Sequence, residues 1–88
     1  MTQRTVSVGS SVGLHARPAA LFVKAAAATG HAVTITLADK TVDARSLLAV
    51  MSLGAGSGAE LVLDVTGTDE ERVADELAAM LESDLDAA

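Results

Sequence analysis

The chain has 88 residues, half of them hydrophobic, with a formal net charge of −6 and no cysteine. A chain of this length buries only about 60–65% of its unfolded surface, so residues 1–88 are expected to form a single domain with a modest core. The absence of cysteine excludes disulfides and thiolate metal sites. A single domain also leaves no room for an active site between two domains. The N-terminus is polar, and no apolar run approaches the roughly 20 residues that cross a bilayer, so we expect a cytoplasmic protein without membrane insertion.

The negative charge is concentrated near the C-terminus. Residues 69–86 contain eight acidic side chains against one basic side chain, whereas residues 1–67 carry a net charge of +1. Such an acidic segment is usually a solvent-exposed helix face. Phe22 is the single aromatic residue, and nucleic-acid binding is excluded because it requires basic patches with stacking rings. His15 and His31 lie sixteen positions apart without carboxylates at ligand spacing, so we expect neither a metal nor another cofactor.

The first half of the chain predicts three strands and one helix. Alternation over residues 4–8 predicts a strand, and residues 16–28 predict a helix that ends at a left-handed Gly30. Alternation over residues 31–37 predicts the clearest strand, which a turn at residues 39–40 joins to a short return strand over residues 41–44. The residues expected to face the core are Val6, Val8, Ala20, Phe22, Val23, Ala27, Val33, Ile35 and Leu37.

The second half predicts two helices around one strand. Residues 46–53 predict a short helix that begins at Ser46, followed by a glycine-rich loop over residues 54–58. Residues 60–66 alternate as a strand, and Thr68 with Glu71 has the pattern of a capping box at the start of the last helix. The residues expected to face the core are Leu61, Leu63, Val65, Val73, Leu77, Met80 and Leu81.

These elements predict an α+β fold in the order β-α-β-β-α-β-α. Each strand has one apolar face and one hydroxyl-rich face, so helices are expected to cover only one side of the sheet. We expect an open-faced β-sandwich, with a four-stranded antiparallel sheet and three helices on one face.

A candidate phosphate site lies at the start of the first predicted helix. Pro18 is favoured in a first helical turn, which places the helix start close to His15. Unpaired backbone N–H groups gather there and would hold a phosphate attached to the imidazole ring, while the guanidinium of Arg17 suits phosphate oxygens. From spacing alone, however, an ordinary surface histidine and a solvated arginine remain the favoured interpretation.

Two segments resemble one known family. Residues 13–20, Gly-Leu-His-Ala-Arg-Pro-Ala-Ala, resemble the active-site signature of HPr, the histidine-containing phosphocarrier family of the bacterial phosphoenolpyruvate:sugar phosphotransferase system. Residues 46–54, Ser-Leu-Leu-Ala-Val-Met-Ser-Leu-Gly, resemble the family's serine phosphorylation segment. The two segments stand at the family's usual separation, and the predicted element order fits along essentially the whole chain.

The resemblance implies a relay protein and not an enzyme. His15 would accept a phosphoryl group on Nδ1 from Enzyme I, with phosphoenolpyruvate as its source, and donate it to the IIA domain of a sugar permease. Arg17 would stabilise the phosphoryl oxygens, and the backbone at Ala16 and Arg17 would donate hydrogen bonds. Transfer of this kind depends mainly on positioning and charge stabilisation, so a small monomer can take part without a pocket.

Ser46 has both a structural and a regulatory interpretation. As an N-cap it stabilises the short helix by about 1 kcal/mol. The resemblance adds phosphorylation of this serine by an ATP-dependent kinase in some bacteria, with a phosphatase as the matching partner. A phosphate there would be tolerated by the helix N-terminus and would repel an acidic docking partner.

An exposed docking patch is predicted beside His15. Residues 46–53 hold more apolar side chains than one buried face can use, so Leu47, Leu48 and Met51 are expected to be exposed, with Ala20 and Lys24 on the neighbouring helix. His31, at a strand start, is expected to be an unimportant surface residue.

The chain departs from the family pattern and leaves other functions open. Val12 replaces an asparagine found in some members, and Ala27 and Ala49 replace lysines, which weakens the expected steering towards acidic partners. One alternative is a nitrogen-regulatory or dihydroxyacetone-kinase phosphorelay that uses the same histidine. Another is a regulatory module that acts through Ser46 or binds a transcription factor or metabolite, although the family's regulatory paralogue lacks the histidine. A hydrolase is excluded for want of a base–nucleophile pair.

Overall fold

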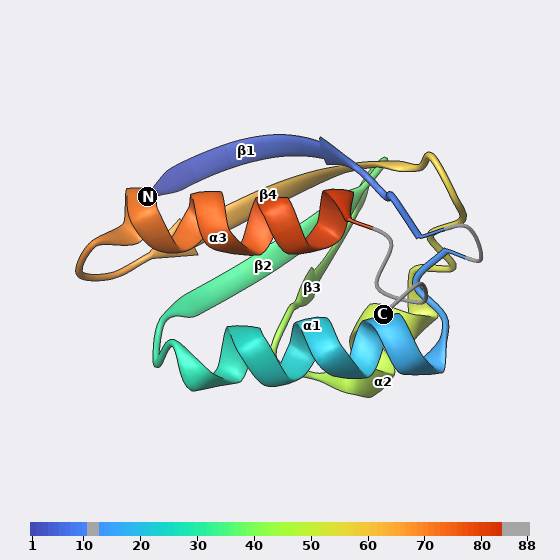
Figure 1. Ribbon diagram of the computed structural model, residues 1–88, viewed down its shortest axis with the longest axis horizontal. Coiled ribbons are helices and arrows are strands. Elements are labelled where there is room, and N and C mark those ends of the chain that lie inside the picture. The colour runs from blue at the N-terminus through green and yellow to red at the C-terminus, as the bar shows by residue number, and fades with distance from the viewer. Residues whose placement is uncertain (11–12, 84–88) are drawn as a thin grey trace.

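The computed structural model describes residues 1–10 and 13–83. Its elements follow the predicted order β-α-β-β-α-β-α (Figure 1). They are β1 (Thr2–Ser7), α1 (Ala16–Ala28), β2 (Ala32–Leu37), β3 (Lys40–Asp43), α2 (Leu47–Ser52), β4 (Glu60–Thr66) and α3 (Glu70–Glu82). None of the helices in the described part of the chain is long and apolar enough to cross a membrane.

The four strands form one antiparallel sheet in the order β1-β4-β2-β3. Figure 1 shows α1 and α3 side by side on one side of this sheet, which confirms the predicted open-faced α+β fold. β1 begins two residues earlier than predicted, because Thr2 already pairs with Val65 of β4. The turn between β2 and β3 lies at residues 38–39, one residue before its predicted place, with Ala38 at φ 56°.

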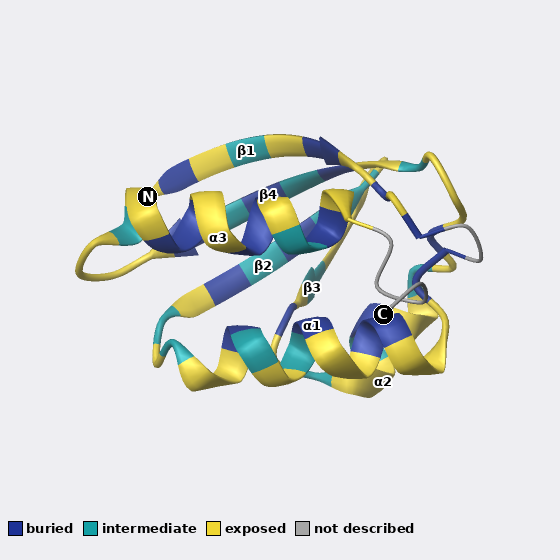
Figure 2. Cartoon of the chain, viewed as in Figure 1, coloured by how far each residue is buried: buried dark blue, intermediate teal, exposed yellow. Residues whose placement is uncertain are grey.

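One hydrophobic core lies between the sheet and the helices (Figure 2). Alternate residues of the strands point into it as predicted, although Leu37 is only half-buried. The prediction for α1 was partly wrong: Phe22 is buried and Val23 half-buried, but Ala20 and Ala27 are exposed. An alanine-rich helix has few polar residues to distinguish its faces, so packing decides which side is buried. The buried residues of α1 are Pro18, Ala19, Phe22 and Ala26.

The start of α3 also differs from its prediction. Asp69, at φ 55°, occupies the N-cap position without a side-chain capping bond, so the capping box of Thr68 and Glu71 was wrong. The neighbouring Glu70 carboxylate instead contacts the Met1 ammonium at 2.6 Å and accepts a hydrogen bond from the Thr2 hydroxyl at 2.6 Å. α3 thus begins later than its local pattern predicts, and its first residue contacts Met1 and Thr2. Farther along α3, Val73, Leu77 and Leu81 are buried and Met80 is half-buried.

Candidate phosphoryl-transfer site

His15 stands at the N-cap of α1. Its backbone is extended, at φ −79° and ψ −174°, and its carbonyl accepts the amide of Ala19 at 2.9 Å. The imidazole is exposed and makes no capping hydrogen bond. Ala16 and Arg17 are the first two residues of α1, so their amides belong to the turn whose N–H groups lack acceptors within the helix. The structure therefore brings together a ring nitrogen, two first-turn amides and the exposed Arg17 at one helix end.

The residue before His15 is fixed in the core. Leu14 is 5% exposed, and its amide donates to the carbonyl of Ala55 at 2.9 Å. Pro18, on the other side, is buried as well. The exposed His15 thus follows the buried, hydrogen-bonded Leu14 directly and precedes the buried Pro18 by three residues.

Three large apolar side chains of α2 are exposed. Leu47 is 39%, Leu48 81% and Met51 40% exposed, whereas Val50 of the same helix is fully buried. Leu47, Leu48 and Met51 are therefore exposed, as predicted. We refer to Leu47, Leu48 and Met51 as the α2 patch.

α1 packs against α2 and has an exposed face of its own. Arg17, Ala20, Leu21 and Lys24 are all exposed, and their spacing of three and four residues places them on one helix face. Leu21 was missed by the sequence reasoning, although its helical spacing from Arg17 and Lys24 could have identified it. Like Leu47, it is 39% exposed.

Ser46 is the N-cap of α2, as predicted. Its Oγ accepts the amide of Ala49 at 3.3 Å, and its carbonyl accepts the amide of Val50 at 3.0 Å. Arg45, next to it, forms an ion pair with Asp43 at 3.0 Å. The Arg45 side chain lowers the pKa of the Asp43 carboxyl through their hydrogen bond, and the same pair raises the pKa of Arg45.

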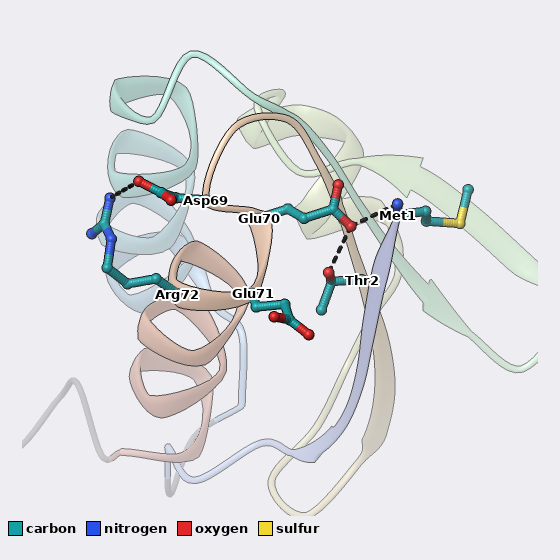
Figure 3. Close-up of a pocket in the computed structure, with 6 residues that line it drawn as sticks. All are labelled: Met1, Thr2, Asp69, Glu70, Glu71 and Arg72. Carbon is teal, nitrogen blue, oxygen red and sulfur yellow. Dashed lines mark hydrogen bonds and ion pairs between the residues drawn. The ribbon is translucent and has the colours of Figure 1, made fainter.

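Two surface cavities lie away from His15. One, of about 590 Å³, is lined by the chain's first two residues and the start of α3 (Figure 3). There, the hydrogen bonds of the N-terminal ammonium and of Thr2 lower the pKa of Glu70 to about 2. The other cavity, of about 480 Å³, lies between the end of α1 and α3. His15 lines neither of these two cavities.

His31 lies partly at the surface, as predicted, but its ring makes two contacts that were not predicted. The ring is half-buried, with Nδ1 2.7 Å from the carbonyl oxygen of Thr29 and Nε2 in contact with that of Thr68. These two contacts, the Thr68 one foremost, raise the pKa of His31. The ring thus links the end of α1 to the loop before α3.

Several residues named in the sequence analysis remain to be placed. Val12 and the acidic residues Asp84 and Asp86 lie outside the described residues. Ala27 is exposed and Ala49 is half-buried. Over residues 1–10 and 13–83, no group of three histidine, cysteine, aspartate or glutamate side chains could hold a metal ion.

Comparisons with known proteins place the chain in one family. Residues 2–83 match the family model described as "PTS HPr component phosphorylation site". The phosphocarrier protein HPr of Streptomyces coelicolor is 47% identical over 98% of this chain and 94% of its own, and the HPr-like protein Crh of Halalkalibacterium halodurans is 38% identical over 96% and 100%. The crystal structure of HPr from Bacillus anthracis superposes with a TM-score of 0.87 at 39% identity, covering 91% of this chain and 95% of the other. The chain therefore belongs to the HPr family of phosphocarrier proteins.

Proposed function

We propose that His15 accepts a phosphoryl group from phosphorylated Enzyme I and donates it to the IIA domain of a sugar permease. The Nδ1 lone pair of the neutral ring attacks phosphorus, the bond from phosphorus to Enzyme I breaks, and the donor atom on Enzyme I recovers its electron pair. The second transfer repeats this exchange with His15 as the donor. Phosphoenolpyruvate is the original source, and the chain works as a cytoplasmic, monomeric, single-domain carrier.

One observation carries this proposal: an exposed histidine at the N-cap of α1, followed by Arg17, in a chain of the HPr family. The first-turn amides of Ala16 and Arg17 can donate to the phosphoryl oxygens, and the helix dipole favours their negative charge. The Arg17 guanidinium offers a planar pair of donors. The site carries and orients the group, and the partner supplies the other half of the reaction geometry.

The α2 patch is the proposed centre of the docking surface for both partners, with Ala20, Leu21 and Lys24 extending it on α1. Exposed apolar side chains surrounded by polar ones are typical of a protein interface. Because the surface is shared, Enzyme I and the IIA domain bind in turn.

A second function is favoured by the relatives named Crh. These HPr-like proteins match over nearly the whole chain, and one is described as a catabolite repression protein in a solved structure. We propose that Ser46 is the site of regulatory phosphorylation by a serine kinase, reversed by a phosphatase. The negative charge would lie next to the α2 patch and weaken the binding of an acidic partner.

A reconstituted relay tests the main proposal. Labelled phosphoenolpyruvate, Enzyme I, this protein and a set of sugar-type and nitrogen-type IIA domains are mixed, with one component omitted in each control. We expect label on sugar-type IIA domains only when the carrier is present. Label on nitrogen-type domains alone would assign the chain to the other relay, and label on neither would refute the proposal.

A further inference from the structure

The segment before His15 lies against the loop that follows α2. Gly13 has φ +78°, and a Cβ atom there would lie 2.6 Å from the carbonyl oxygen of Ala55 and 2.8 Å from the Cα of Gly56. Both neighbours are backbone atoms, which cannot turn aside as a flexible side chain can. Only glycine fits this position without moving one of the two loops.

The same two loops are joined by hydrogen bonding and burial. The amide of Leu14 donates to the carbonyl of Ala55 at 2.9 Å, so one oxygen both accepts this bond and limits the space at Gly13. Leu14 and Ala55 are 5% and 4% exposed. The loop after α2 is in turn fixed to the end of β1, where Gly58 donates to the carbonyl of Val8 and Val8 donates to that of Ala59, both at 2.9 Å.

We propose that Gly13 and the Ala55–Gly56 backbone form a clamp that positions His15 for phosphoryl transfer. The inference rests on the proposed function of His15. The clamp fixes Leu14, and α1 begins two residues later, so the Leu14–Ala55 bond limits how far the His15 backbone can shift. Gly13 and Ala55 are positioning residues, because neither touches the reacting atoms. Since the same loop follows α2, the clamp also fixes the ring relative to the docking surface on which the partner sits.

A matched pair of glycine substitutions separates close approach from backbone strain. Gly30, just beyond the other end of α1, has φ +71°, but a Cβ atom there would meet nothing within 4 Å. Gly13→Ala and Gly30→Ala therefore impose similar conformational strain, and only Gly13→Ala forces the two loops apart. The comparison is made under conditions where circular dichroism shows both variants folded.

The first readout is single-turnover transfer from phosphorylated Enzyme I. Misplacing a reacting group by about 1 Å can cost on the order of a hundredfold in rate. We expect Gly13→Ala to be at least about tenfold slower at saturating carrier, with KM nearly unchanged because the α2 patch is intact. We expect Gly30→Ala to react at the wild-type rate. Equal rates for the two variants would overturn the inference.

The second readout is the imidazole NMR signals, which do not depend on transfer. Gly13→Ala should shift the His15 ring signals and leave those of His31, while Gly30→Ala should leave those of His15. If wild type accepts no phosphoryl group, the proposed function fails, and the His15 signals alone decide whether the clamp exists. If Gly13→Ala does not fold, Ala55→Gly replaces it, because this variant keeps the carbonyl group but makes the loop more flexible. We expect Ala55→Gly to slow transfer at least about threefold. An unchanged rate would overturn the inference.

Discussion

His15 and His31 lie near opposite ends of α1 and differ in what surrounds their rings. His15 is exposed and makes no capping bond, whereas His31 contacts two backbone carbonyl oxygens. A ring available to a partner protein suits transient chemistry, and a ring held by two acceptors suits a structural link. At the scale of single residues, these surroundings support the proposed transfer at His15 and a structural role for His31.

Arg17 is expected to accelerate transfer through its charge and its planar fork. Arg17→Ala should lower the rate of phosphoryl uptake at least about tenfold, because the donors that stabilise the transferring oxygens are lost. Arg17→Lys should give an intermediate rate, since it keeps the charge without the paired donors. Arg4→Ala is the control, because Arg4 is paired with Asp75 at 2.9 Å on another part of the surface. Equal rates for Arg17→Ala and Arg4→Ala would contradict this role.

His31 is expected to make stability depend on pH. Both ring nitrogens face carbonyl oxygens and can donate together only when the ring is protonated. Its pKa is raised above 6.5 by these bonds, with Asp69 adding to the effect and Arg72 opposing it. The stabilisation is therefore complete below pH 6.5 and is lost as pH rises through the folded-state pKa.

Urea denaturation from about pH 5 to about pH 9 measures this effect. The free energy of unfolding of wild type should fall, relative to His31→Gln, over the upper part of that range. His15→Ala, which leaves both His31 contacts in place, is the control, and its free energy of unfolding should still fall over the upper part of that range relative to His31→Gln. A constant difference between wild type and His31→Gln at every pH would show that protonation of His31 does not contribute.

At the scale of elements, α2 divides into a buried residue and an exposed patch. Leu48→Glu changes a side chain that is 81% exposed, so the free energy of unfolding should stay within about 0.5 kcal/mol of wild type. The Kd for Enzyme I, measured by titration calorimetry, should rise at least about tenfold, because a charge would enter the apolar centre of the interface.

Val50→Ala is the matched variant for this test. Val50 is fully buried, so its truncation should cost about 2 kcal/mol of stability. Its Kd for Enzyme I should stay near the wild-type value when measured well below the unfolding temperature. A loss of stability in Leu48→Glu as large as that in Val50→Ala would place Leu48 in the core and remove the patch from the account.

The sequence predicted most where a pattern is local. The alternation in β2 and β4 and the cap at Ser46 depend on neighbours within a few residues, and the structure contains all three. The buried face of α1 was predicted only in part, because alanine is compatible with either side of a helix. The start of α3 was not predicted correctly, and its first residue, Glu70, contacts Met1 and Thr2, sixty-eight or more residues away, which a local pattern does not show.

In the candidate site, too, local features were predicted and contacts between distant segments were not. The placement of His15 at a helix start followed from Pro18 and the local motif, and the exposed α2 patch from an excess of apolar residues. The clamp at Gly13 and the link through His31 were not predicted, because both join loops that are distant in the sequence. Contacts of this kind depend on how the sheet brings the loops together, which residue patterns alone do not give.

At the scale of the whole molecule, the N-terminus is joined to α3. The ammonium of Met1 contacts Glu70, as Figure 3 shows, and β1 pairs with β4 along its length. The pKa of Glu70 is lowered to about 2 by this ammonium and by Thr2. The carboxylate therefore stabilises the fold fully above about pH 4.5, and the contribution is lost as pH falls through about 2.

Acid unfolding checks this link between the two ends of the fold. Glu70→Gln should remove part of the fall in stability between about pH 4.5 and about pH 2. Glu71→Gln, one position along α3 and lining the same cavity, is the control and should keep the part of this fall that Glu70 contributes. Acetylation of the N-terminal amine should act like Glu70→Gln; identical acid profiles for all four proteins would contradict the link.

The central claim is that the exposed histidine at the start of α1 carries the phosphoryl group. Wild type, His15→Ala and His31→Ala are incubated with Enzyme I and phosphoenolpyruvate, and intact-protein mass spectrometry counts the phosphoryl groups added. We predict one acid-labile, base-stable group on wild type and on folded His31→Ala, and none on His15→Ala. Uptake that survives His15→Ala, or no uptake by wild type, would contradict the account.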